Sequence, residues 1–100
     1  MNANNAQNRS INILGIPYEI REVDIIDKGT FLVGQINYTE QVIKIAKGLG
    51  EEYRTQTLIH EILHGILDAL GYSELNNDEQ KVQGIASALH QVFGPFISFF

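Results

Sequence analysis

The spacing of apolar residues changes near the middle of the chain, and this change constrains the fold more than any other feature. Before residue 46, apolar residues recur at close to every second position, which is typical of strands. After residue 50, they recur every three or four positions, which is typical of amphipathic helices. The pattern therefore predicts an α+β domain in which a small sheet precedes the helices.

The first half is predicted to be mostly extended. Residues 11–26 show near period-two spacing, and residues 27–30 (DKGT) signal a turn. Two further strands, at 31–38 and 41–46, flank a tight turn at Thr39-Glu40. Because this pair is a hairpin, we expect the sheet to be antiparallel.

Two helices are predicted in the second half. The first covers residues 51–70, where the apolar residues form one stripe, and Gly71 ends it. Residues 72–77 are expected to form a loop, after which Asn77 or Asp78 caps a second helix that stops at Gly94-Pro95. The expected architecture is a small antiparallel sheet packed on two helices, with the first helix central.

Length and composition exclude several classes of protein. A chain of 100 residues is one small domain, here 11–100, after a polar tail at 1–10 that we expect to be disordered. A net charge of −5 and scattered basic residues argue against nucleic-acid binding. No apolar run is long enough for a membrane span or a signal peptide, so we expect a cytoplasmic protein. Without Cys, any metal must be held by His, Asp or Glu.

The first predicted helix contains a metal-binding motif, because residues 60–64 read HEILH. Two histidines at i and i+4 lie one above the other, so both imidazoles can reach one Zn²⁺ ion. A Glu directly after the first His can take a proton from a metal-bound water. The motif predicts His60 and His64 as zinc ligands and Glu61 as the general base.

The position of the motif on the helix supports this interpretation. On a helical wheel, both histidines fall just past the edge of the apolar stripe, and Glu61 falls further toward solvent. A catalytic zinc needs this combination of shielded ligands and one open position. The alternative is an accidental pair of surface histidines, and such a match arises by chance in roughly one chain in several hundred of this length.

A catalytic zinc also needs a third protein ligand. Glu79 opens the second helix at the edge of its stripe, although a plain N-terminal helix charge is the alternative there. Asp78 is better placed as the cap. Asp68 lies one turn after His64 and either holds the outer N–H of that ring or is solvated. His90 lies about 16 Å along the helix from Glu79, too far to share the ion.

Three tyrosines are candidates for stabilising a tetrahedral oxyanion by donating a hydrogen bond. They are Tyr53, Tyr72 and Tyr38. Each also suits a core or rim aromatic, and the sequence does not choose among them.

The two motif segments together resemble the ImmA/IrrE-type zinc metallopeptidases. Residues 57–64 read TLIHEILH and residues 78–86 read DEQKVQGIA. Family members often carry a TLAHELGH helix, followed by a helix that a Glu opens. The resemblance implies a compact zincin-like domain of the kind found in phages and mobile elements. It also implies zinc ligation by His60, His64 and Glu79, with Glu61 as the base.

The resemblance implies a function as well, namely zinc-dependent hydrolysis of peptide bonds in a protein substrate, with a regulator as one candidate. In zincin-like peptidases the substrate pairs with a sheet edge, which would make residues 31–38 the edge strand. Two positions depart from the family pattern. Leu63 stands where a Gly usually precedes the second His, and Gln83 stands where an Asn is usual.

The alternative function is a metal-stabilised protein-binding module of a phage or mobile element, without proteolytic activity. A short chain has little room for a substrate cleft, and the apolar end at 96–100 suits docking or a dimer contact as well as the core. An open fourth position at the metal favours the enzyme, whereas a fourth side chain there favours the module.

Overall fold

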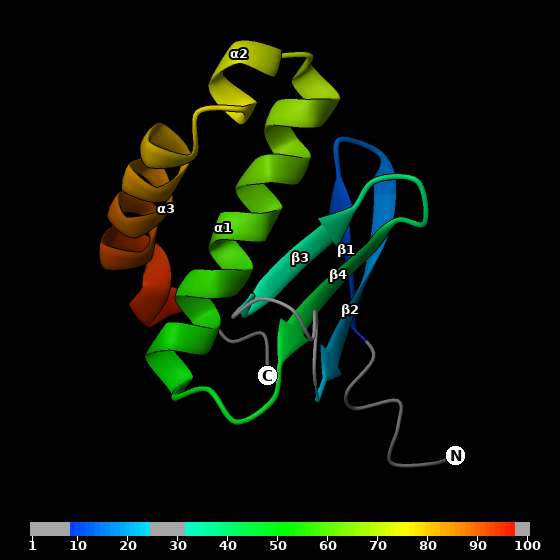
Figure 1. Ribbon diagram of the computed structural model, residues 1–100. Coiled ribbons are helices and arrows are strands. Elements are labelled where there is room, and N and C mark those ends of the chain that lie inside the picture. Colours follow the sequence, from blue (N-terminus) through cyan, green and yellow to red (C-terminus); the bar gives the residue numbers. More distant parts are fainter. Residues whose placement is uncertain (1–8, 25–31, 98–100) are drawn as a thin grey trace.

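The computed structural model describes residues 9–24 and 32–97, which form a small sheet and helices in an α+β arrangement (Figure 1). In chain order the elements are β1 (Arg9–Ile13), β2 (Ile16–Val23), β3 (Gly34–Asn37), β4 (Val42–Ala46), α1 (Glu51–Leu70), α2 (Ser73–Asn76), α3 (Glu79–Phe93) and the 3-10 turn η2 (Gly94–Phe96). The change of period in the sequence therefore marks the boundary between the sheet and the helices.

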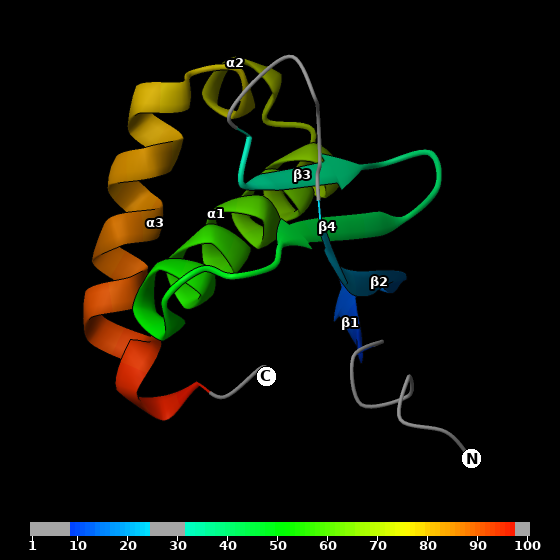
Figure 2. The ribbon, with the colours of Figure 1, turned by 60° about the horizontal axis from the view of Figure 1, so that its bottom comes forward.

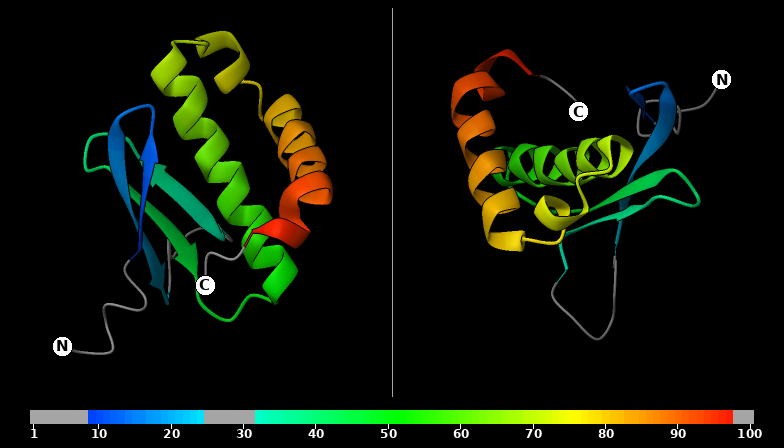
Figure 3. Two further views of the ribbon diagram at one scale, coloured as in Figure 1. Left: turned by 180° about the vertical axis from the view of Figure 1, so that it is seen from behind. Right: turned by 90° about the horizontal axis from the view of Figure 1, so that it is seen from above.

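Helix α1 is the middle layer, with the sheet on one side and α3 on the other (Figures 2 and 3). Two apolar clusters follow from this position. Between α1 and the sheet, Leu58 packs with residues of β1, β2 and β4. Between α1 and α3, the buried residues are Ile59, Leu63, Leu67, Val82 and Ala86. The prediction of a central first helix is confirmed, and both of its long sides are used for packing.

The boundaries of α1 agree with the prediction. The helix begins after Gly50, with Glu51 and Glu52 in its first turn, where carboxylates suit the positive end of the helix dipole. It ends at Gly71, which takes a left-handed conformation with φ of 77° and donates its N–H to the carbonyl of Asp68. That conformation is open to glycine without steric cost, so the chain turns back toward α3 here.

The predicted antiparallel sheet is wrong, because the sheet is mixed. Its order is β1-β2-β4-β3, with two antiparallel hairpins and a parallel pairing of β2 with β4 between them. A hairpin sets the direction of its own two strands only. The most apolar strand, β4, has Ile43 and Ile45 fully buried, so it occupies the interior beside β2. The more polar β3 is left at the edge, as predicted for residues 31–38.

Several boundaries differ from the prediction. β1 begins at Arg9, so the last two residues of the expected tail belong to the sheet. The expected loop at 72–77 contains the short helix α2. The predicted strand at 31–38 ends at Asn37, so Tyr38 belongs to the turn that leads into β4. The rest of the tail, the turn at 27–30 and residues 98–100 lie outside the described residues.

Candidate metal centre

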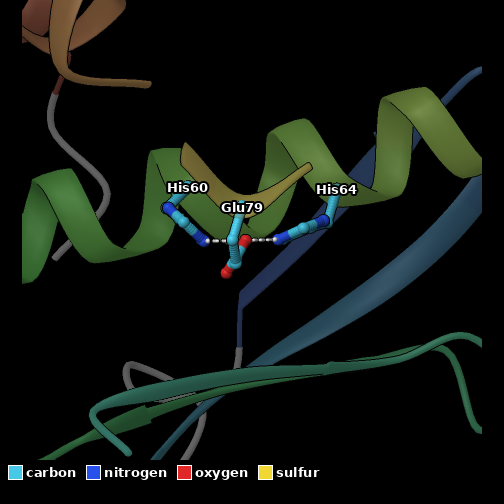
Figure 4. Close-up of side chains that lie close together, drawn as sticks. All are labelled: His60, His64 and Glu79. Atoms are coloured by element: carbon cyan, nitrogen blue, oxygen red, sulfur yellow. Dashed lines mark hydrogen bonds and ion pairs between the residues drawn. The ribbon is translucent and has the colours of Figure 1, made fainter. Parts of the chain in front are cut away.

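His60, His64 and Glu79 converge on one point, close enough together to bind a metal ion (Figure 4). The Oε1 atom of Glu79 lies 3.2 Å from Nε2 of His60 and 2.7 Å from Nε2 of His64. The ligand atoms of the three side chains all lie within 4.8 Å of one another. The predicted ligand set is therefore brought together in space by two different helices.

The packing of α3 on α1 is what delivers Glu79 to the histidines. Val82 and Ala86 are fully buried against the Ile59 and Leu63 side of α1, and the small Ala86 lets the two helices approach closely. The side chain of Asp78 accepts a hydrogen bond from the N–H of Lys81, which confirms Asp78 as the N-cap. Glu79 is then the first residue of α3, and its side chain lies between the two histidine side chains (Figure 4).

The outer nitrogens of both rings are held by side-chain amides. Nδ1 of His60 lies 2.7 Å from Oε1 of Gln83, and Nδ1 of His64 lies 2.6 Å from Oδ1 of Asn76. An amide oxygen only accepts hydrogen bonds, so each Nδ1 must carry a proton and donate it. In the neutral rings, both Nε2 atoms are then left with a lone pair that faces the centre.

This arrangement of donors and acceptors calls for a positive charge at the centre. Each of the two nitrogen lone pairs otherwise faces a carboxylate oxygen, at 3.2 Å for His60 and 2.7 Å for His64, and a proton shared between these atoms or a cation between them relieves the repulsion. A tetrahedral zinc ion holds its ligand atoms about 3.3–3.5 Å apart, since its bonds are about 2.0–2.1 Å long. The two separations from Glu79, 2.7 and 3.2 Å, are shorter than this, and an outward shift of the exposed Glu79 side chain would open the space that an ion needs, so the three side chains can accommodate a metal ion.

The centre is shielded on the histidine side and open on the other. Both histidine side chains are 15% exposed, whereas the Glu79 side chain is 66% exposed. Among the described residues, no fourth His, Asp or Glu joins the group. Three protein ligands is the number found in catalytic zinc sites, whereas structural sites have four.

A cleft of about 610 Å³ leads to the centre. Its walls are the edge strand β3 with the residues just before it, the side of α1 that carries the motif, and the start of α3. The lining residues from α1 are Tyr53, Gln56, Thr57, His60, Glu61 and His64. A 100-residue chain thus does have room for a cleft beside its candidate metal centre.

Glu61 lines this cleft, but it is not turned toward solvent as the helical wheel predicts. It is 8% exposed, because the sheet extends past the apolar stripe of α1 and covers it. Gly34 of β3 allows this approach, since a Cβ atom there would lie 3.0 Å from Oε2 of Glu61 and 2.6 Å from Cγ2 of Thr57. The absence of a side chain at position 34 lets the edge strand lie directly against the carboxylate.

The environment of Glu61 suits a proton acceptor. Burial raises the pKa of the Glu61 carboxyl above its ordinary value, and the nearby Glu79 also raises it, whereas His60 and His64 act in the opposite direction. A carboxylate with a raised pKa holds a transferred proton more readily than an exposed one does. Glu61 is thus a buried carboxyl group beside the candidate metal ligands.

The three candidate tyrosines occupy different places. Tyr72 is exposed and is not among the described residues that line the cleft. Tyr53 lines the cleft, but it precedes His60 by two helical turns. Tyr38 also lines the cleft, and burial raises the pKa of its hydroxyl above the ordinary value. Its hydroxyl accepts a hydrogen bond from the amide of Asn76 at 3.2 Å.

Two other expectations are decided by the geometry. Of the two alternatives for Asp68, the solvated one is confirmed, because Asn76 occupies the outer nitrogen of His64 and Asp68 is exposed. His90 lies outside the metal-binding group, at a separate cavity near Glu51 and Glu52, as its distance along α3 requires.

The supporting amides were not identified from the sequence. In the sequence, Gln83 stands out only as a departure from the pattern of the family that the motif resembles, yet its place one turn after Glu79 puts it beside the same centre. Asn76 carries no such signal, because it lies in a stretch that was expected to be a loop.

Comparisons with known proteins do not identify a family, since no family model, no curated protein and no solved structure matches the chain. Within residues 9–24 and 32–97, none of the helices combines the length and apolar character that a membrane crossing needs.

Proposed function

We propose that this protein is a zinc-dependent metallopeptidase of compact zincin-like type. The observation that carries the proposal is the convergence of His60 and His64 on Glu79, beside the buried Glu61 and at the end of a cleft. Imidazole nitrogen and carboxylate oxygen are donors that Zn²⁺ accepts readily. The motif resemblance to ImmA/IrrE-type peptidases points in the same direction.

His60, His64 and Glu79 would hold the ion, and the amides of Gln83 and Asn76 would keep the two rings in the tautomer that leaves Nε2 free. When bound, Zn²⁺ would polarise the scissile carbonyl and lower the pKa of a water toward about 7. The remaining groups of the chain act on protons and on the substrate backbone.

Glu61 would carry the proton during hydrolysis. Its carboxylate takes one proton from the attacking water while the water oxygen bonds to the carbonyl carbon. It then delivers that proton to the amide nitrogen as the C–N bond breaks, so the products are a carboxylic acid and an amine. The burial of Glu61 supports this role, because it brings the affinity of the carboxylate for a proton closer to that needed at neutral pH.

The substrate would lie along β3. Within the described part of the chain β3 is an edge strand, with one side free to pair with an extended peptide, and the same strand forms one wall of the cleft. A peptide paired there would pass the buried base and the metal ligands. This favours a flexible or unfolded segment of a protein as substrate.

A metal-stabilised binding module is the second candidate. In its favour, the C-terminal end of the described chain carries two large exposed apolar side chains, Phe93 and Phe96, which suit a docking surface. Against it, the group of possible ligands ends at three side chains in the described residues. A structural zinc site is closed by four.

Metal analysis and inhibitor binding test the proposal without knowledge of the substrate. We expect one zinc ion per chain, and we expect a peptide hydroxamate, which needs an open metal position, to bind the zinc-loaded protein. H60A should lose the metal. E61Q should keep the metal and the hydroxamate but lose cleavage of a mixed peptide library, read by mass spectrometry. E52Q removes a carboxylate from the first turn of the same helix and is the matched control.

Two results would overturn the proposal. Protein that takes up no divalent ion at all excludes any metallopeptidase. Protein that binds zinc tightly but rejects the hydroxamate has a closed site, and the binding module then becomes the better description.

A further inference from the structure

Tyr38 links the sheet to the metal centre. It lies in the turn directly after the edge strand β3, and its side chain reaches across to α1 and α2. Its hydroxyl lies 3.5 Å from the backbone carbonyl oxygen of His64 and accepts a hydrogen bond from Nδ2 of Asn76 at 3.2 Å. The same Asn76 holds the ring of His64 through Oδ1. Tyr38, Asn76 and His64 therefore form a closed circuit of hydrogen bonds.

The hydrogen bond from the Tyr38 hydroxyl to the backbone carbonyl of His64 sets the direction of the other two. A carbonyl oxygen can only accept, so the Tyr38 hydroxyl donates its proton to His64 and offers a lone pair to its other neighbour. The NH₂ end of Asn76 must then face Tyr38, which turns its oxygen toward Nδ1 of His64. That oxygen draws the ring proton to Nδ1 and leaves Nε2 free for a metal.

A reversed amide would have the opposite effect. If the NH₂ group of Asn76 faced Nδ1, the ring proton would move to Nε2 and block coordination. Without the Tyr38 hydroxyl, little distinguishes the two orientations of the amide. We propose that Tyr38 is a positioning residue that sets the tautomer and orientation of His64 through Asn76, so that the edge strand and the metal centre form one unit. This inference rests on the metal centre of the proposed function.

The other histidine does not have a circuit of this kind. Gln83, which holds His60, donates to the Ser87 hydroxyl, and Gln56 donates to that hydroxyl as well. A serine hydroxyl accepts or donates with equal ease, and no carbonyl acceptor is among its described partners. The expected effect of Tyr38 is therefore specific to His64.

The test compares Y38F with Y53F. Both tyrosines line the cleft, but within the described residues the Tyr53 hydroxyl has no hydrogen bond to a group at the centre. We expect Y38F to weaken zinc binding about 2- to 10-fold, the effect of one hydrogen bond, in chelator competition. We expect Y53F to leave it unchanged.

A second readout needs no metal. Nitrogen-15 NMR of the metal-free protein, well above the ordinary histidine pKa of about 6.5, reports which ring nitrogen carries the proton. We expect His64 to be protonated at Nδ1 in the parent protein and to become a mixture of tautomers in Y38F, with His60 unchanged. A purely structural role for Tyr38 would lower the free energy of unfolding without altering the tautomer.

A double-mutant cycle identifies the route. In an N76A background, Y38F should have no further effect on zinc affinity, because the amide through which it acts is gone. The inference is overturned if Y38F leaves both the His64 tautomer and zinc affinity unchanged, or if it weakens zinc binding equally in both backgrounds. If the parent protein binds no zinc while Y38F still shifts the tautomer, the proposed function fails and the positioning role stands.

Discussion

The two zinc-ligand candidates on α1 are supported in unlike ways. His60 is held by Gln83, which lies on the same helix as Glu79, four residues later. His64 is held by Asn76 of α2, which is in turn held by Tyr38 beside the sheet. The support of His60 comes from one helix pair, whereas that of His64 comes from three segments, which are α1, α2 and the turn after β3 that precedes His64 by 26 residues. The difference indicates that the site depends on the sheet as well as on the helices.

The largest expected effect comes from removing Glu79, the side chain that contacts both His60 and His64. E79A should weaken zinc binding by more than 100-fold, about 3 kcal/mol, because one of three protein ligands is lost. Zinc at about 1,000 times its Kd should stabilise the parent protein by about 4 kcal/mol, measured by urea unfolding with and without a chelator, and E79A should lose most of this.

The matched control for E79A is E74A, which removes an exposed carboxylate from α2 that lies outside the metal-binding group. Equal zinc binding by E79A and the parent protein would mean that the Glu79 carboxylate is not a ligand. His60 and His64 would then not belong to one metal site that includes Glu79.

A smaller effect should distinguish the support of His64 by Asn76 from the support of His60 by Gln83. N76A and Q83A should each weaken zinc binding about 10- to 100-fold, the usual cost of losing the partner of a ligating histidine. We expect N76A to be the more severe, because Asn76 is partly buried and Gln83 is exposed, so water can replace the Gln83 amide more easily.

The neighbouring variants N77A and Q80A are the controls, since neither amide contacts a ligand in the described residues. Chelator competition measures all four affinities. A more severe loss in Q83A than in N76A would reverse the comparison and place the dominant support on the α1–α3 pair.

The smallest expected effect concerns the pH dependence of the free energy of unfolding. It arises from Glu61, which lies near both His60 and His64. Burial raises the pKa of Glu61 above its ordinary value of 4.5, so the metal-free folded protein holds this proton more tightly than the unfolded chain does. The stabilising contribution of the protonated carboxyl is fully present below pH 4.5 and is lost as the pH rises through the folded-state value.

E61Q carries no charge at this position, so the loss of stability with rising pH that Glu61 causes should disappear. Metal-free E61Q should therefore unfold at higher urea concentration than the parent protein at neutral pH, and the two should converge at acidic pH. A parent protein that is more stable than E61Q at neutral pH would show that the ionised carboxylate is favoured in the folded state, contrary to its burial.

Local patterns predicted the helical half of the molecule well. The extent of α1, its end at Gly71, the cap at Asp78 and the placement of His60 and His64 on one face all follow from spacing within one or two helical turns. The approach of Glu79 to the histidines depends instead on the packing of α3 on α1. The predicted exposure of Glu61 is wrong because the prediction rests on local spacing alone. A helical wheel describes only the helix itself, and it carries no information that Gly34 of a distant strand lies against that carboxylate.

The sequence by itself determined the two long helices, the approximate positions of the strands and which side chains share the motif-bearing face of α1, because these properties depend on residues only a few positions apart. Tertiary structure alone decided the parallel pairing of β2 with β4, the burial of Glu61 and the circuit from Tyr38 through Asn76 to His64. Each of these depends on how closely two remote segments approach, which is settled by the packing of the whole domain and not by any local preference.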